Sequence, residues 1–420
     1  MDKISVIISC PIDTYSGYGA RSRDFVKALM ANSKYDIKVV SQRWGNTSFG
    51  YLEEHGEHEL ASLIIPQVTS RPDIWIQITV PNEFQKVGKY NIGVTAGIET
   101  TICDASWIDG CNRMDLVLTS SNHSKNVFEA TRFTENDQAG NPIRELKLTA
   151  PVEVLFEGAD LTKYFKTSSS FDLNSIKETF CFLFVGTWLQ GDYGQDRKNL
   201  GLTIKSFLET FKNKQDQPAL ILKTSLGTSS HMNTDIILRK IESIRKTVKG
   251  KLPNIYLIDG ELTDEEVNSL YNHSKVKAMI SFTKGEGFGR PLLEFSLTGK
   301  PIVASNWSGH LDFLDKEFVH LVGGTLTKVH KSAASKGMIL EEASWFSPDD
   351  SEVGKAYKSI IKNYKQHSEL GKRQAFKSKT DFSFDKMKEV LHTILDKSVP
   401  DFPKQVELKL PTLTLPKFKV

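Results

Sequence analysis

Short apolar runs alternate with helix-length segments along most of the chain, and this alternation restricts the possible folds more than any other feature of the sequence. In the first half, the runs lie at Ile4–Ile8, Ile37–Val40, Ile74–Val80, Ile92–Thr95, Leu116–Leu118 and Val152–Leu155. In the second half, they lie at Phe180–Val185, Leu220–Lys223, Ile255–Ile258, Ala278–Ser281, Ile302–Ala304 and Val319–Val322. Such runs, separated by helical segments, are typical of βα units with parallel sheets. The pattern predicts an α/β protein with two Rossmann-like domains.

The length of 420 residues agrees with this division, because it exceeds what one ordinary core accommodates. A polar, serine-rich stretch at 167–175 predicts the boundary, with an N-terminal domain over 1–168 and a C-terminal domain over 169–350. Residues 351–398 show helical spacing, and we expect them to cross back to the first domain. Residues 399–420 form a tail of Pro, Lys and Leu, which we expect to dock on this chain or on a partner rather than remain free.

Composition indicates an ordinary soluble protein. Hydrophobic residues make up 39% and charged residues 25%, and the net charge of +3 is too small to imply a nucleic-acid or membrane partner. The four cysteines form no C-x-x-C pair, so buried free thiols are the first interpretation, with a zinc site or disulfides as alternatives. No apolar run approaches the ~18 residues of a membrane span. We therefore expect no transmembrane segment and a cytoplasmic location, at most peripheral to a membrane.

The segment Lys284–Ser305, KGEGFGRPLLEFSLTGKPIVAS, carries the strongest functional pattern. Gly285, Gly287 and Gly289 follow an apolar run and form a loop in which backbone N–H groups can approach a ligand closely. Pro291 fits the first turn of a helix that starts after the loop. Because a helix N-terminus favours anionic or hydroxyl-rich ligands, the segment predicts a binding site.

Two glutamates flank the start of this helix, and EGFGRPLLE resembles the E-x7-E signature of family 4 of the retaining GT-B glycosyltransferases. The resemblance implies that Glu294 binds the ribose hydroxyls of a nucleotide. It also implies that Glu286 and the amides of Gly287, Phe288 and Gly289 hold the transferred sugar. The alternative is an ordinary βα loop with two surface glutamates.

A second segment places two cations between a strand and a helix that starts at about Asn199. Arginine and lysine bind diphosphate in complementary ways, and the resembled family uses both at this place. The resemblance therefore implies that Arg197 and Lys198 serve catalysis by binding the donor diphosphate. The family's arginine often follows the strand glycine directly, where this chain has Thr187 and Trp188, so Lys198 is the firmer assignment. The alternative is a solvated pair.

Two further positions belong to the first half of the chain. Gly17 and Gly19 lie between the first apolar run and an amphipathic helix, a pattern that by itself is weak evidence for phosphate binding. The resemblance implies a glycine loop beside the donor diphosphate and the acceptor, and the alternative is a plain tight turn. Glu99 follows a predicted strand, and the resemblance implies a catalytic position facing the cleft. Many family members have a histidine nearby, whereas His123 starts a helix here and is expected to be structural.

The resemblance extends from about Ile4 to Leu395 and implies a GT-B architecture, in which two Rossmann-like domains face each other across a cleft. It further implies a retaining glycosyltransferase with a nucleotide-sugar donor, a UDP- or GDP-sugar, as cosubstrate and with no cofactor. No His/Cys cluster with metal spacing stands out, which favours a metal-independent enzyme. The resemblance implies a same-face mechanism, in which the leaving phosphate helps to accept the acceptor proton. A nucleotide-sugar epimerase, a sugar phosphorylase and a non-catalytic sugar-nucleotide binding protein are the alternatives.

The acceptor is the least constrained part of this interpretation. The resemblance favours a glycan or a lipid-linked glycan, with a modified DNA base as a minority case. The basic stretch 239–251 is either a solvated helix face or a surface for an anionic partner such as DNA, lipid or acidic glycan.

Overall fold

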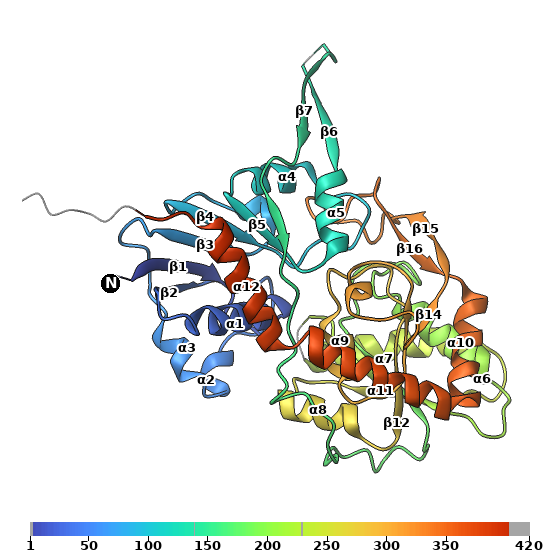
Figure 1. The fold of residues 1–420 in the computed structure, drawn as a ribbon. Coiled ribbons are helices and arrows are strands. Elements are labelled where there is room, and N and C mark those ends of the chain that lie inside the picture. Colours follow the sequence, from blue (N-terminus) through green and yellow to red (C-terminus); the bar gives the residue numbers. More distant parts are fainter. Residues whose placement is uncertain (1–2, 138, 228–229, 403–420) are drawn as a thin grey trace, which may run out of the picture.

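The computed structural model describes residues 3–137, 139–227 and 230–402, and it contains two parallel six-stranded sheets (Figure 1). The first sheet has the order β2 (Tyr35–Ser41), β1 (Ile4–Cys10), β3 (Ile74–Ile78), β4 (Tyr90–Val94), β5 (Leu116–Thr119) and β8 (Val152–Val154). The second has the order β11 (Ile255–Ile258), β10 (Ala219–Lys223), β9 (Cys181–Val185), β12 (Val276–Ser281), β13 (Ile302–Ser305) and β14 (His320–Val322). Each strand comes from one predicted run, which confirms the predicted fold class. We call the parts of the chain around the two sheets the first and second domains.

Helices cover both sheets, as the βα pattern requires. The first domain contains α1 (Gly17–Met30), α2 (Tyr51–Glu54), α3 (His58–Ser62), η1 (Pro81–Glu83), α4 (Ala105–Asn112) and α5 (Asn122–Ala130). The second contains α6 (Leu200–Phe211), α7 (His231–Lys246), α8 (Asp264–Asn272), α9 (Arg290–Ser296), η2 (Gly309–Asp312), α10 (Asp350–Lys362) and α11 (Tyr364–Asp381). The last helix, α12 (Phe384–Ser398), lies against α1 of the first domain (Figure 1).

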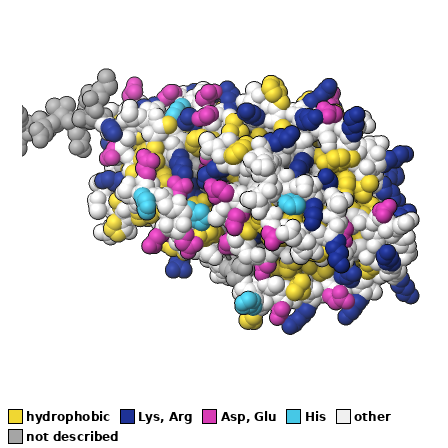
Figure 2. Space-filling view, turned by 90° about the horizontal axis from the view of Figure 1, so that it is seen from below, with side chains coloured by type: hydrophobic (Ala, Val, Ile, Leu, Met, Phe, Trp, Pro, Cys, Tyr) yellow, Lys and Arg dark blue, Asp and Glu magenta, His cyan; other side chains and the backbone are white. Residues whose placement is uncertain are grey.

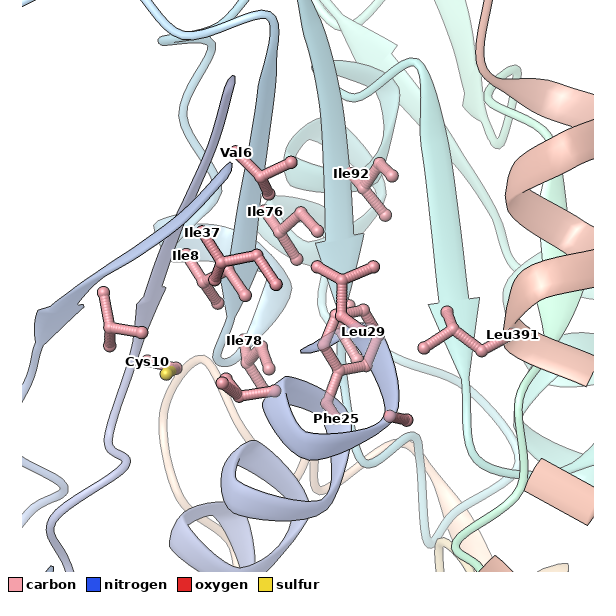
Figure 3. Packing of buried hydrophobic residues seen from close by; sticks show 14 of the residues in the cluster. Val6, Ile8, Cys10, Phe25, Leu29, Ile37, Ile76, Ile78, Ile92 and Leu391 are labelled. Atoms are coloured by element: carbon pink, nitrogen blue, oxygen red, sulfur yellow. The ribbon is translucent and has the colours of Figure 1, made fainter. Parts of the chain in front are cut away.

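The core of the first domain explains this return of the chain (Figure 3). Strand residues such as Val6 and Ile76 point toward Phe25 and Leu29 of α1, and Leu391 of α12 fills the same buried cluster. All five side chains are nearly inaccessible to solvent. Burying a large apolar side chain contributes about 1.5–3 kcal/mol, so the C-terminal helix is an integral part of the first domain.

The chain leaves the first core soon after β8. Leu155 still belongs to the first cluster, whereas Tyr164, Leu173 and Ile176 are buried with strands of the second sheet. The serine-rich stretch 167–175 therefore already lies on the second domain, where the hydroxyl and amide groups of Ser169 and Ser170 contact Ser269. The predicted domain limits remain predictions. The tail prediction falls almost wholly outside the described residues.

Two antiparallel hairpins were not predicted. The hairpin of β6 (Arg132–Asn136) and β7 (Pro142–Lys147) projects from the body of the molecule (Figure 1). The hairpin of β15 (Gly324–Lys328) and β16 (Ser344–Pro348) lies in the second domain. Most residues of β6, β7 and β15 are exposed, so these strands lack the apolar pattern that marks a buried strand.

All four cysteines are free and buried, in agreement with the first interpretation of the sequence. Lys and Arg side chains stand among hydrophobic ones over the second domain, at the right of Figure 2. Within the described residues, no helix is both long enough and apolar enough to span a membrane. The predicted basic stretch, 239–251, begins in α7. Most residues of this helix are exposed or partly exposed, and its buried residues include Ile237, Ile241 and Ile244.

Candidate functional site

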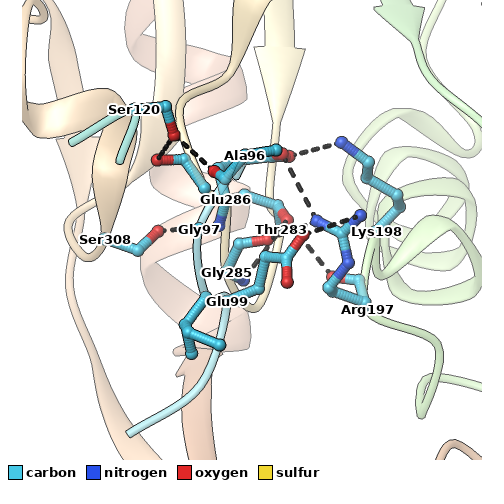
Figure 4. A network of polar contacts seen from close by, with 12 residues as sticks. Ala96, Gly97, Glu99, Ser120, Arg197, Lys198, Thr283, Gly285, Glu286 and Ser308 are labelled. Atoms are coloured by element: carbon cyan, nitrogen blue, oxygen red, sulfur yellow. Dashed lines mark hydrogen bonds and ion pairs between the residues drawn. The ribbon is translucent and has the colours of Figure 1, made fainter. Parts of the chain in front are cut away.

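The glycine-rich loop between β12 and α9 lies at the carboxyl edge of the second sheet, where a doubly wound fold binds its ligands (Figure 4). The amide of Glu286 donates to Ser308 Oγ at 2.9 Å, and the Glu286 carbonyl accepts from Gly309 N at 2.9 Å. Gly289 caps α9 with φ of 100°, a conformation that favours glycine. These contacts fix the loop and aim the Glu286 side chain at the start of α6.

Glu286 pairs there with both predicted cations. Lys198 Nζ lies 2.6 Å from Glu286 Oε1, and Arg197 Nη1 lies 3.4 Å from Oε2. Arg197 also donates to the carbonyl of Gly285 at 2.7 Å, and its Nη2 lies 3.6 Å from Glu99 Oε1 in the first domain. The structure thus brings together the four residues predicted as catalytic, on three loops from two domains.

Electrostatics make this cluster strongly ionic. Burial opposes ionisation of Glu286, but the charges of Lys198 and Arg197 outweigh it and hold the pKa of Glu286 at about 2. Burial lowers the pKa of Lys198, whereas the carboxylates of Glu99 and Glu286 outweigh burial and raise the pKa of Arg197. Glu286 and Glu99 balance the two cations, so an anionic ligand at this place binds Lys198 and Arg197 in competition with these carboxylates.

The first domain approaches this loop so closely that two glycines are required. A Cβ at position 285 would lie 2.0 Å from the carbonyl oxygen of Glu99, and one at 287 would lie 2.2 Å from that of Ala96. Ser120 Oγ bridges the domains by donating to the Gly287 carbonyl at 3.1 Å. The absence of side chains at positions 285 and 287 therefore also serves contact between the domains.

The side chain of Phe288 has a different place from the loop around it. It is 2% exposed and packs against Phe313 in the core of the second domain, with ring centroids 5.0 Å apart. Only its backbone faces the loop, so a ligand role for Phe288 is restricted to its amide.

Glu294 lies in a separate pocket of ≈ 230 Å³ between the domains. The residues that line it include Gly17, Arg23, Asp24, Asp264, Arg290 and Glu294. Arg290 Nε donates to Glu294 Oε1 at 2.8 Å, and Arg290 Nη1 lies 2.5 Å from Asp24 Oδ2 of α1. Burial raises the pKa of Glu294 to about 7, against the opposing charge of Arg290. Glu294 and Glu286 thus have opposite protonation tendencies.

The two glycines near the N-terminus lie inside α1 and not before it, which corrects the predicted loop. Ser16 caps the helix by accepting from Gly19 N at 2.9 Å, an arrangement that satisfies a free helix amide. A Cβ on Gly19 would lie 2.2 Å from the carbonyl of Thr14, so this glycine is required by packing. Gly17 has open space and lines the pocket of Glu294. Of the pair, only Gly17 meets the pocket.

A partly buried histidine, His123, and a buried one, His310, lie near the loop, at the contact of the domains. His123 of α5 packs edge-on against Trp307, with ring centroids 4.6 Å apart, and burial lowers its pKa to about 4. His310 Nε2 lies 2.7 Å from the carbonyl of Ser305. His123 lies at the start of α5, as expected from the sequence, and its structural role stays a prediction; His310 was not singled out. No group of three or more His, Cys, Asp or Glu within the described ranges is arranged to hold a metal ion.

A segment beyond the hairpin strand β15 adds a further contact between the domains. The amide of Thr101 donates to the Ser344 carbonyl at 2.9 Å, and Trp107 Nε1 donates to the Gly337 carbonyl at 2.8 Å. The sequence analysis did not predict these two contacts. It also did not single out Arg290 or Asp24. The local signal was Arg290 itself, a charged residue at the start of a short helix that also contains Glu294.

Comparison with known proteins finds solved structures of similar fold and no match by sequence. No protein-family model matches the chain, and no curated protein matches it. Sucrose-phosphate synthase from Thermosynechococcus elongatus is 12% identical with a TM-score of 0.62, and the match covers 94% of this chain and 98% of that chain. A glycosyltransferase from Rickettsia africae is 12% identical with a TM-score of 0.63, covering 96% and 100%.

A third structure, of the Anabaena protein HepE in complex with UDP and glucose, is 12% identical with a TM-score of 0.61 and covers 94% of this chain and 100% of that chain. Matches over nearly the full length of both chains establish the architecture: two Rossmann-like domains in the GT-B arrangement. At this level of identity, the likeness establishes the fold alone.

Proposed function

We propose that the chain is a retaining glycosyltransferase that moves a sugar from a nucleotide sugar, a UDP- or GDP-sugar, to an acceptor. The observation that carries the proposal is the meeting of Lys198, Arg197, Glu286 and Glu99 at the junction of the domains. A departing diphosphate needs cations placed in advance, and two are held here by a common carboxylate. The complex of HepE with UDP and glucose supports a nucleotide-sugar donor on this fold.

The proposed roles follow the position of each group. Glu294, in the pocket between the domains, binds the ribose hydroxyls, and Gly17 lets the nucleotide approach α1. Lys198 and Arg197 bind the diphosphate, while Glu286 orients them and the sugar. Glu99 faces the same junction from the first domain, on the side of the acceptor.

The proposed reaction is a same-face substitution. The bond between the anomeric carbon and the diphosphate oxygen breaks while the acceptor oxygen bonds to the same carbon from the same side. The acceptor proton passes to the leaving phosphate oxygen, so no enzymic nucleophile is needed. The acceptor class that we propose is a glycan or a lipid-linked glycan.

The test is substitution of Lys198 by Ala. We expect turnover to fall by at least about 10²-fold, because a preorganised charge on the leaving group is lost, with a smaller effect on the melting temperature. Turnover is measured as acceptor-dependent release of free nucleotide, and Lys214→Ala, an exposed lysine after α6, is the control. Normal turnover with reduced stability would identify Arg197 and Lys198 as a structural pair.

The same assay separates the alternative functions. An epimerase converts the donor without acceptor, a phosphorylase requires phosphate as cosubstrate, and a binding protein releases no nucleotide. Nucleotide release that depends on an acceptor supports the transferase alone.

A further inference from the structure

Arg290 forms the densest charge cluster at the boundary of the two domains. Its Nη1 lies 2.5 Å from Asp24 Oδ2 and 3.9 Å from Glu157 Oε2, both in or next to the first domain. Its Nε donates to Glu294 Oε1 at 2.8 Å, one helical turn along α9. The side chains are 20% exposed for Arg290, 18% for Asp24 and 8% for Glu294, so solvent screens these contacts only in part.

The cluster requires a guanidinium group. Burial alone would lower the pKa of Arg290, but Asp24, Glu294 and Glu157 together raise it well above the usual value. The planar guanidinium group of Arg290 presents N–H donors in two directions, so this one side chain pairs with Asp24 of the first domain and Glu294 of the second. A lysine supplies a single ammonium group that cannot reproduce both contacts. Without Arg290, Glu294 would lose its ion pair, and Arg21 would be the cation left beside Glu157 and Asp24, which is unfavourable.

The position of the cluster gives it a consequence for ligand binding. Arg290, Asp24 and Glu294 all line the pocket of ≈ 230 Å³ between the domains. We propose that Arg290 is a positioning residue of this nucleotide site: it fixes the Glu294 carboxylate toward the pocket and ties it through Asp24 to α1. Nucleotide affinity and closure of the two domains are thereby coupled. The identity of the ligand rests on the proposed function, whereas the tie between the domains does not.

The coupling works in both directions. A nucleotide that binds only when both domains line the pocket stabilises the closed arrangement, and the closed arrangement raises nucleotide affinity by the same factor. Loosening the contact between Arg290 and Asp24 lowers the population of the closed state, and the apparent affinity falls with it.

The first experiment measures closure without any ligand. Spin labels on cysteines introduced at Asp36 and Lys214, exposed positions on the two domains, report the distance between the domains. The four native cysteines are at most 1% exposed and do not take the label. We expect Asp24→Ala to broaden the distribution toward longer distances. Alanine is the best helix former, so α1 tolerates this change.

A matched control is Asp385→Asn, which breaks a surface ion pair with Lys388 within α12. We expect its distance distribution to equal that of the parent protein. An unchanged distribution in Asp24→Ala would overturn the tie between the domains.

The second experiment measures nucleotide binding by calorimetry with UDP and with GDP as probes. We expect Asp24→Ala to weaken binding of the preferred probe about tenfold, or about 1.4 kcal/mol. The direction of the change in nucleotide affinity separates the two explanations. Asp24 is an anion beside a site for an anionic ligand, so direct loss of its charge would strengthen binding. Equal or tighter binding would therefore overturn the coupling.

A pH series separates positioning of Glu294 from a purely structural role. The charged groups that face Glu294 are Arg290, Asp264 and Asp24, with the phenols of Tyr164 and Tyr271 nearby. Affinity is expected to rise as pH increases through about 7, where Glu294 ionises. In Arg290→Gln the cation is lost and the midpoint moves to higher pH, whereas Arg290→Lys retains most of the parent midpoint.

The outcomes separate this inference from the proposed function. If the parent protein binds neither UDP nor GDP, the proposed nucleotide site is wrong, and the spin-label distances still test the tie between the domains. If the parent binds a nucleotide and the midpoint in Arg290→Gln equals that of the parent, Arg290 does not position Glu294.

Discussion

Glu286 and Glu294 lie on one loop–helix segment but differ in their nearest charges. Glu286 meets two cations and keeps its pKa at about 2, whereas Glu294 shares one arginine with other carboxylates and has a pKa of about 7. Glu286 is therefore a fixed anion over the whole physiological range. Glu294 changes its charge near neutrality, so the pocket between the domains has a pH-dependent charge that the glycine-rich loop lacks.

This difference predicts an effect of Glu294→Gln on stability. The pKa of Glu294 is raised from 4.5 to about 7 on folding, so the folded state binds more protons than the unfolded state between these values. Stability should then fall as pH rises from 4.5 to 7, by about 3 kcal/mol. The glutamine variant should lose this dependence, melt at a higher temperature than the parent at pH 8, and bind nucleotide more weakly.

Thermal unfolding between pH 4 and 8, together with calorimetry, checks this prediction. Asp385→Asn, an exposed carboxylate on α12, is the control and should keep the parent's pH profile. A glutamine variant that is less stable than the parent at pH 8 would contradict the prediction.

At the scale of elements, the strands of both sheets were predictable because each combines an apolar run with a helical connection. The hairpin of β6 and β7 was not, since its residues are mostly exposed and lack alternation. For the site, the glycine-rich loop and the cations before α6 were visible as local patterns. The pairing of Arg290 with Asp24 was not, because it joins residues far apart in the chain and depends on how the domains meet.

The glycine-rich loop itself gives a prediction for Gly287→Ala. A Cβ at this position would lie 2.2 Å from the Ala96 carbonyl, so the two domains must separate locally. Because the clash is between domains and not within one, we expect a large loss of turnover with little change in melting temperature. The control is Gly323→Ala, which has no atom within 4 Å of its added Cβ. Full turnover in Gly287→Ala would show that close approach of Ala96 is not required.

On the scale of the whole molecule, the described residues of the two domains meet at several separate places. Arg290 and Asp24 join them at the pocket, Arg197 and Glu99 join them at the glycine-rich loop, and Trp107 and Gly337 join them near the β15–β16 hairpin. Each contact alone is modest, since a typical hydrogen bond contributes about 0.5–1.5 kcal/mol. Because these contacts are spread over the junction, closure of the two domains depends on all of them. The site therefore forms only when the two domains are in contact.

The last prediction concerns metal ions. Lys198 and Arg197 lie at the proposed diphosphate position and supply the positive charge that a divalent cation provides in other enzymes. We therefore expect turnover to be the same after treatment with EDTA as before it. A diphosphate carries oxygen ligands of its own and needs few protein ligands to bring Mg²⁺ into a site, so kinetics must decide this point. Loss of turnover in EDTA that is restored by Mn²⁺ or Mg²⁺ would contradict the metal-independent mechanism. If turnover persists in EDTA and falls in Lys198→Ala, the side-chain cations carry the charge of the leaving group.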